Sequence, residues 1–155
     1  MTLLERLGAK KPHERTEPSS KRTGSYDRIV FSCGYLCGGG MLGIHEEYSL
    51  VRRESGASRL TYSYRKSFEH EEISGEAEPS EELFEEILRI YREAGVRGYG
   101  KLERSDMIVL DAPFVSVDFR VDGLDTRICG DDIVPDQGRG LIGDVRDAFY
   151  NYIFK

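Results

Sequence analysis

The chain has 155 residues, of which 39% are hydrophobic and 32% charged, and this suits one globular domain with a single core. The formal net charge is −6, but it is unevenly spread. Seven Lys and Arg residues accompany four acidic residues in positions 1–28, whereas fifteen accompany twenty-four in the remainder. An acidic domain repels a phosphate backbone, so nucleic acid is not an expected partner.

Cysteine content and hydropathy indicate where the protein resides. Three cysteines cannot all pair and are not spaced like a disulfide framework, which favours reduced thiols and a cytoplasmic location. No apolar run is long enough for a membrane span or a signal peptide. Residues 1–25 are predicted to be a flexible basic leader, and residues 26–155 a single domain.

Alternating apolar and polar residues predict three strands in the first half of the domain. Residues 29–37 alternate first, and Gly38-Gly39-Gly40 breaks the pattern. Residues 44–53 and then 59–65 alternate again, with a turn between them at residues 54–58. Three strands with short connections favour an antiparallel meander.

A helix is predicted to begin at Ser80 and to end at Gly95, after an acid-rich connection over residues 69–78. Ser80 can cap the first turn, and the two glutamates that follow suit the positive end of the helix dipole. Glycine readily adopts the left-handed conformation that ends many helices. The apolar stripe of this helix contains Leu83, Phe84, Ile87, Leu88, Tyr91 and Ala94.

The second half is predicted to hold three more strands and a last helix. Residues 107–110 form a short apolar run, and residues 115–121 alternate cleanly. Residues 124–128 return after Asp122-Gly123, the strongest hairpin signal in the chain. After a polar loop, the last helix has an apolar stripe of Leu141, Ile142, Val145, Ala148, Phe149, Tyr152 and Ile153.

The predicted order of elements is therefore βββ-α-βββ-α. Runs of strands separated by single helices are typical of the α+β class. We expect a mostly antiparallel sheet of five to six strands with the two helices packed on one face.

Several turn signals accompany this order of elements. They are the glycines at 38–40, the tyrosine-rich strands, the acid-started helix, Gly98-Tyr99-Gly100, Ser105-Asp106, Leu110-Asp111, Asp122-Gly123 and a loop containing Pro135. Together they resemble a loose family of small, uncharacterised bacterial α+β domains, some of them lipoprotein-anchored, over residues 26–154. The chain differs from that family in having no tryptophan, and we expect no lipoprotein leader. The resemblance implies a fold and no particular chemistry.

The glycine-rich segment at residues 38–43 matches G-x-G-x-x-G. A dinucleotide site requires a helix directly after this motif, because the amides of its first turn hold the pyrophosphate. Residues 44–50 alternate like a strand instead. We therefore interpret the segment as a hairpin loop.

Candidate ligands for a metal or redox site are Cys33, Cys37, Cys129, His45 and His70. Cys33 and Cys37 form a C-x3-C motif, and residues four apart on a strand are separated by about 13 Å. Zinc needs its ligands about 2.0–2.3 Å away, so the two thiols converge only if Tyr35-Leu36 forms a tight turn. Cys33 also lies on the apolar face with Phe31, where a buried thiol is ordinary.

A second candidate cation site is the loop that contains Asp131, Asp132 and Asp136. Hard cations take several oxygen ligands, and a carboxylate cluster can begin such a site. The spacing does not match an EF-hand loop. Acids close to a helix start are also favoured by the helix dipole alone.

Neither a G-x-S-x-G motif nor a nucleophile with a suitable base is present, so an enzyme is not the favoured interpretation. Tyrosines on the strands suit either a half-buried sheet or a protein-recognition surface. We expect a non-catalytic protein-binding or interaction domain of a bacterial intracellular protein, with another protein or a second copy as partner and no cofactor. The alternative is a small metal-dependent or thiol-dependent protein that uses the Asp131/Asp132/Asp136 loop or Cys33 and Cys37.

Overall fold

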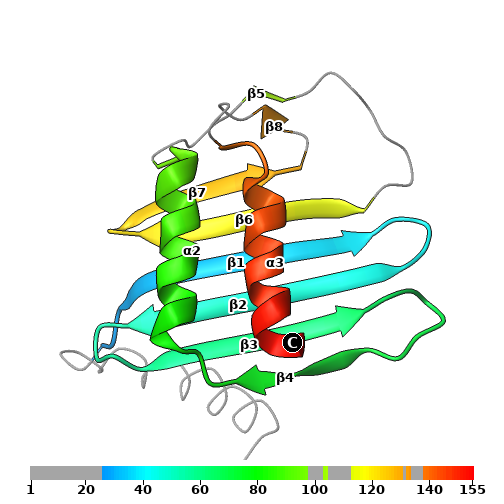
Figure 1. The fold of residues 1–155 in the computed structure, drawn as a ribbon, viewed down its shortest axis with the longest axis horizontal. Helices are drawn as coiled ribbons and strands as arrows, with labels where there is room; N and C mark the ends of the chain where they lie inside the picture. Colours follow the sequence, from blue (N-terminus) through cyan, green and yellow to red (C-terminus); the bar gives the residue numbers. More distant parts are fainter. Residues whose placement is uncertain (1–25, 98–102, 105–112, 131, 134–137) are drawn as a thin grey trace, which may run out of the picture.

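The computed structural model describes residues 26–97, 103–104, 113–130, 132–133 and 138–155. The predicted leader and the predicted strand at residues 107–110 lie outside these residues. Within them, the chain forms one six-stranded sheet with two helices on one face, and a separate two-stranded pair (Figure 1). No helix among the described residues is both long and apolar enough to cross a membrane.

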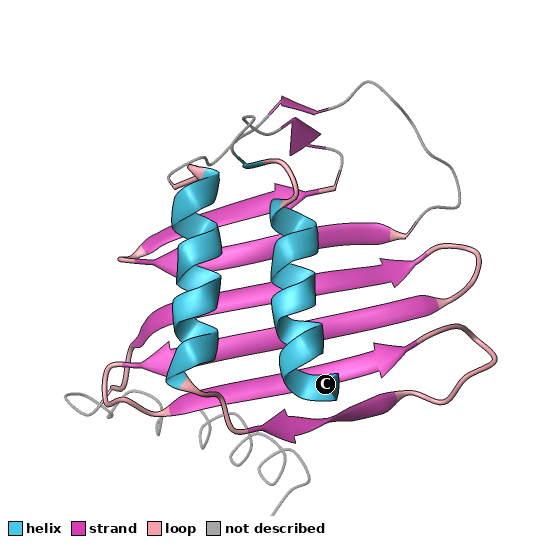
Figure 2. Cartoon of the chain, viewed as in Figure 1, coloured by secondary structure: helices cyan, strands magenta, loops and turns pink. Residues whose placement is uncertain are grey.

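The main sheet is antiparallel throughout, in the order β4-β3-β2-β1-β6-β7. Its strands are β1 (Ile29–Gly39), β2 (Ile44–Arg53), β3 (Ser58–Arg65), β4 (Ile73–Ala77), β6 (Phe114–Val121) and β7 (Leu124–Cys129). The small pair consists of β5 (Glu103–Arg104) and β8 (Asp132–Ile133). The helices are α2 (Glu81–Ala94) and α3 (Leu141–Phe154), which lie side by side across the strands (Figure 2). This arrangement confirms the predicted α+β class, with both helices on one face.

One segment that the sequence predicts to be a connection contains a strand. The acid-rich stretch 69–78 contains β4, which pairs with β3 at the edge of the sheet. Ile73, Gly75 and Ala77 alternate with Ser74 and Glu76, but glycine and two small residues gave this stretch a weak strand signal. Pairing with β3 decides the conformation there, because the edge of a sheet offers unpaired backbone groups to any extended neighbour.

Helix α2 begins and ends as the sequence predicts. The Ser80 side chain accepts a hydrogen bond from the Leu83 backbone amide, and Gly95 adopts a left-handed conformation with φ of 67°. The predicted hairpin between β6 and β7 is also confirmed, since Asp122 and Gly123 both have positive φ, 54° and 79°.

The core lies between the helices and one face of the sheet, here called the helix face. Alternate residues of β1 point toward the helices, as the sequence predicts, and Cys33, Tyr35 and Cys37 are all buried there. Phe31 meets Phe84 of α2 edge-on, while Tyr48 of β2 stacks on Phe149 of α3.

The other side of the sheet, here called the outer face, is covered by neither helix. Small or polar residues alternate with the core residues along the central strands, among them Ser32, Gly34, Ser49, Thr61, Ser63 and Ser116. Ion pairs between neighbouring strands flank them, with Arg127–Asp118 and Arg120–Asp125 on β6 and β7 and Arg59–Glu76 on β3 and β4. The sheet is therefore apolar on the helix face and polar on the outer face.

Candidate functional site

Cys33 and Cys37 lie on one continuous strand, so they do not converge. β1 runs without a turn through Tyr35 and Leu36, and the two thiols point toward the helices from different cross-strand rows. Both are buried, 1% and 7% exposed. Burial and the charge of Asp118 raise the pKa of the Cys33 thiol well above its usual range. Burial, followed by the charge of Glu46, raises the pKa of Cys37. Both thiols are held protonated, which makes them poor nucleophiles.

Cys129 lies on the other side of the sheet. It pairs with Ser116, which pairs in turn with Leu36, the residue between Tyr35 and Cys37. Because neighbours along a strand point to opposite faces, Cys129 is on the outer face while Cys33 and Cys37 are on the helix face. The sheet therefore separates the third cysteine from the other two.

Of the three aspartates in the predicted cation-binding loop, the structure describes Asp132. Asp132 Oδ2 accepts a hydrogen bond from the Cys129 backbone amide at 2.7 Å, so this carboxylate caps the end of β7. Asp131 and Asp136 lie outside the described residues. Among the described residues, no three His, Cys, Asp or Glu side chains are grouped to hold a metal ion.

A buried carboxylate that was not singled out in the sequence lies between β2 and α3. Glu46 is 3% exposed, and its Oε2 accepts hydrogen bonds from Tyr48 Oη at 2.5 Å and from Arg146 Nε at 2.8 Å. The Arg146 guanidinium also stacks over the Tyr150 ring, 4.2 Å from its centre. Across the strands, Glu46 lies between Cys37 and Tyr64. The alternation of β2 contains the signal, because Glu46 falls on the same side as Tyr48 and Leu50.

The groups around Glu46 are all held in their protonated forms. Burial, and then the hydrogen bond to Glu46, raise the pKa of Tyr48. Burial, and then the charge of Glu46, raise the pKa of Tyr64, and burial raises that of Tyr35. A carboxylate already paired with a guanidinium and surrounded by protonated phenols supplies no activated nucleophile. This cluster instead attaches α3 to β2.

Two hollows on the outer face, of about 460 and 570 Å³, are open and shallow. Ion pairs line both of them, with Arg59 bound to Glu76 in one and Asp118 bound to Arg127 in the other. Arg53 also lines the first hollow, where its Nη1 donates to the backbone carbonyl of Asp27 at 2.9 Å.

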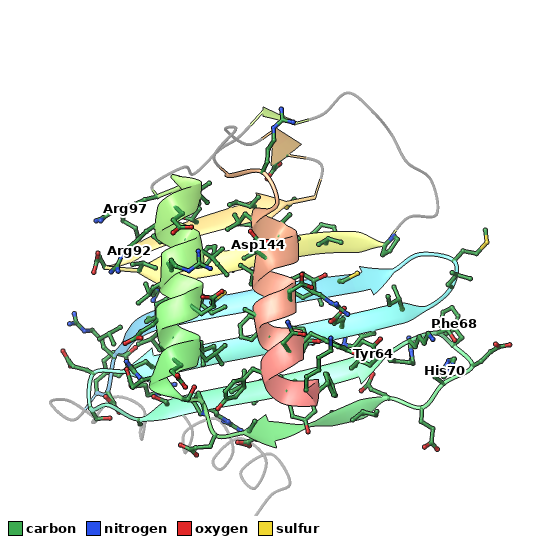
Figure 3. The ribbon with its side chains drawn as sticks, viewed as in Figure 1. Tyr64, Phe68, His70, Arg92, Arg97 and Asp144 are labelled. Atoms are coloured by element: carbon green, nitrogen blue, oxygen red, sulfur yellow. The ribbon has the colours of Figure 1, made fainter. Side chains whose placement is uncertain are left out.

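Large apolar side chains are exposed on the two loops at the end of the sheet where β1 meets β2 and β3 meets β4. Met41, Leu42 and Phe68 are 68%, 75% and 68% exposed, and we call them the loop-end surface. Met41 and Leu42 belong to the β1–β2 loop, while Phe68 belongs to the β3–β4 loop (Figure 3). Phe114, also exposed, begins β6 beside Gly38 at the same end.

The loop-end surface is held in place by contacts between the two loops. The Phe68 backbone amide donates to the Leu42 carbonyl at 3.0 Å, and Arg65 Nε donates to the Gly43 carbonyl at 3.1 Å. The Phe68 ring lies directly on Gly43, where an added Cβ would come within 2.4 Å of it. Gly43 also has φ of +75°, so both its conformation and its contact require glycine. Hydrogen bonds from the β3–β4 loop and from the end of β3 thus hold the backbone of the β1–β2 loop beside Phe68.

Acidic residues follow Phe68 in the same loop. Glu69, Glu71 and Glu72 are all exposed, and none of them forms an ion pair with another described residue. His70, between them, is hydrogen-bonded through Nδ1 to Ser67 Oγ at 2.7 Å. The loop-end surface is therefore an apolar patch bordered by glutamates that form no ion pair within the described part of the chain.

A scan of the chain against protein-family models finds no match, and a search of curated proteins finds none either. The resemblance to small bacterial α+β domains stays a prediction.

Proposed function

We propose that this chain is a non-catalytic interaction domain that binds another protein through the loop-end surface. The observation that carries the proposal is the exposure of Met41, Leu42 and Phe68 on two loops that are hydrogen-bonded to each other. Exposed apolar groups are unfavourable in water, and adjoining ones mark interaction sites when the fold holds them outward.

The tyrosines of the strands play a different part. Tyr35 and Tyr48 are buried, and Tyr62 and Tyr64 pack against Phe154 of α3. Tyr35 and Tyr48 belong to the core and Tyr62 packs against it, which agrees with the interpretation of these residues as parts of a half-buried sheet. The proposed surface is thus the end of the sheet and not the strand tyrosines.

The proposed setting is the cytoplasm of a bacterial cell. All three cysteines are free thiols, which suits a reducing compartment.

A photo-crosslinking residue tests the surface directly. We expect p-benzoylphenylalanine at position 42, in the full chain expressed in bacteria, to give a discrete protein adduct on irradiation. The matched control is the same residue at Leu124, which is also exposed but lies at the opposite end of the sheet. Adducts of equal strength at both positions, or an adduct at position 42 that survives Phe68→Ser, would contradict the proposal.

A further inference from the structure

The charges around the loop-end surface restrict what can dock on it. The β3–β4 loop carries Glu69, Glu71 and Glu72 against a single lysine, Lys66. The other nearby cation, Arg65, is turned back toward the fold, with its Nε on the Gly43 carbonyl and its guanidinium 5.2 Å from the centre of the Phe68 ring. A group that approaches the apolar side chains from this loop therefore meets a loop that carries a net negative charge.

Two occupants are disfavoured by this charge. A second copy of the chain would bring the same three glutamates to the same place, and like charges across an interface repel. An anionic membrane surface would be repelled for the same reason.

We infer that the partner presents a peptide segment in which apolar side chains alternate with Lys or Arg. Its apolar groups cover Met41, Leu42 and Phe68, and its cations pair with Glu69, Glu71 and Glu72. Each exposed charge pair adds little by itself, but three of them around a dehydrated apolar centre set both the affinity and the choice of partner. This inference rests on the proposed function and names the chemistry of its partner.

The two loops need little rearrangement to bind such a segment. Contacts between them already fix Leu42 and Phe68, and Gly43 underlies the aromatic ring. Side chains held in the binding conformation lose less entropy on association than mobile ones do. The glutamates lie on the same loop as Phe68, so a short segment can reach both kinds of group.

Selection from a random twelve-residue peptide library on the immobilised full-length protein tests the inference. We expect the enriched peptides to combine apolar residues with Lys or Arg, and their affinity to fall as salt is added. The variant Glu69→Gln/Glu71→Gln/Glu72→Gln should weaken the best peptide about tenfold at low salt and flatten its salt dependence. The matched control is Glu78→Gln/Glu82→Gln/Glu85→Gln, which removes three exposed glutamates away from this loop and should leave the affinity unchanged.

The remaining outcomes separate the two proposals. Peptides that lose binding with Phe68→Ser but respond equally to both glutamine variants would overturn the basic partner and leave the docking surface standing. Enrichment of acidic peptides would also overturn the basic partner. Peptides that bind Phe68→Ser as tightly as the unaltered protein would overturn the docking surface itself. A dimer in sedimentation that Phe68→Ser disperses would overturn the basic partner in favour of a second copy.

Discussion

At the scale of residues, burial governs the chemistry of Cys33 and Cys37. Cys33 and Cys37 lie in the core, and burial is the main cause of the rise in both pKa values. A protonated thiol neither attacks nor binds a metal readily. Because the folded state keeps both thiols protonated, the same burial makes the free energy of unfolding depend on pH in the alkaline range.

We predict that the free energy of unfolding falls as the pH rises above about 8.5, the usual pKa of an unfolded cysteine. Below that pH both states hold the proton and the contribution is complete. Above it, the unfolded chain loses protons that the folded thiols keep until the pH passes their raised pKa values. The fall should be at most about 1.4 kcal/mol per pH unit for each thiol. Urea unfolding at pH 7.5, 8.5 and 9.5 measures it.

The variant Cys33→Ala/Cys37→Ala is the control for this pH dependence. It should be less stable at neutral pH but should lose less stability between pH 8.5 and 9.5. An equal loss in both proteins would show that other groups titrate in this range.

At the scale of elements, a partly buried ion pair links α3 to the sheet. Glu46 is on β2 and Arg146 is on α3, a hundred residues apart in sequence, and the carboxylate is almost completely enclosed. Phe149 and Tyr48 stack beside the pair, so the contact is part polar and part aromatic. Removal of one charged partner from such a contact leaves the other uncompensated.

We predict that Arg146→Met lowers the free energy of unfolding by about 3 kcal/mol, because the Glu46 carboxylate stays buried without its cation. Chemical denaturation at pH 7 measures the loss. Arg127→Met removes an exposed pair with Asp118 and should cost less than about 1 kcal/mol. The double variant Glu46→Leu/Arg146→Met should be more stable than Arg146→Met alone. If the losses of stability of Glu46→Leu and Arg146→Met simply add in the double variant, the ion pair is not the source of the loss in Arg146→Met.

At the scale of the whole molecule, the sheet and the two helices form two layers, and the helices cover only one face of the sheet. Leu50 on β2 points into the core and is fully buried, whereas Leu36 on β1 points to the outer face and is 37% exposed. Both are leucines on central strands, so replacing each with alanine compares the packing of the two faces through the same change of side chain.

We predict that Leu50→Ala lowers the free energy of unfolding by about 3 kcal/mol, since it leaves a cavity under the helices. Leu36→Ala should cost less than about 1 kcal/mol. Thermal and urea unfolding compare the two. Similar losses would mean that the outer face is packed as tightly as the helix face.

Local patterns in the sequence were sufficient to predict much of the fold. The alternation of β1, the Ser80 cap, the Gly95 end and the Asp122-Gly123 hairpin all depend on residues close together in sequence, and all four are confirmed. Strand β4 was missed, because its conformation depends on pairing with β3 more than on its own composition. The candidate metal ligands were a plausible set as a sequence, but the sheet places Cys129 on the face opposite Cys33 and Cys37.

By itself, the sequence determined the class of fold, the order of most elements and the face of strands β1, β2, β3 and β6 that enters the core, because periodicity and turn chemistry act over a few residues. Only the tertiary structure decided that Glu46 meets Arg146, and that Phe68 is held on Gly43 with its ring exposed. These contacts join segments from different elements, and no local pattern encodes which element will lie beside which. The loop-end surface exists because two hairpins end side by side, which is a property of strand order and not of either loop alone.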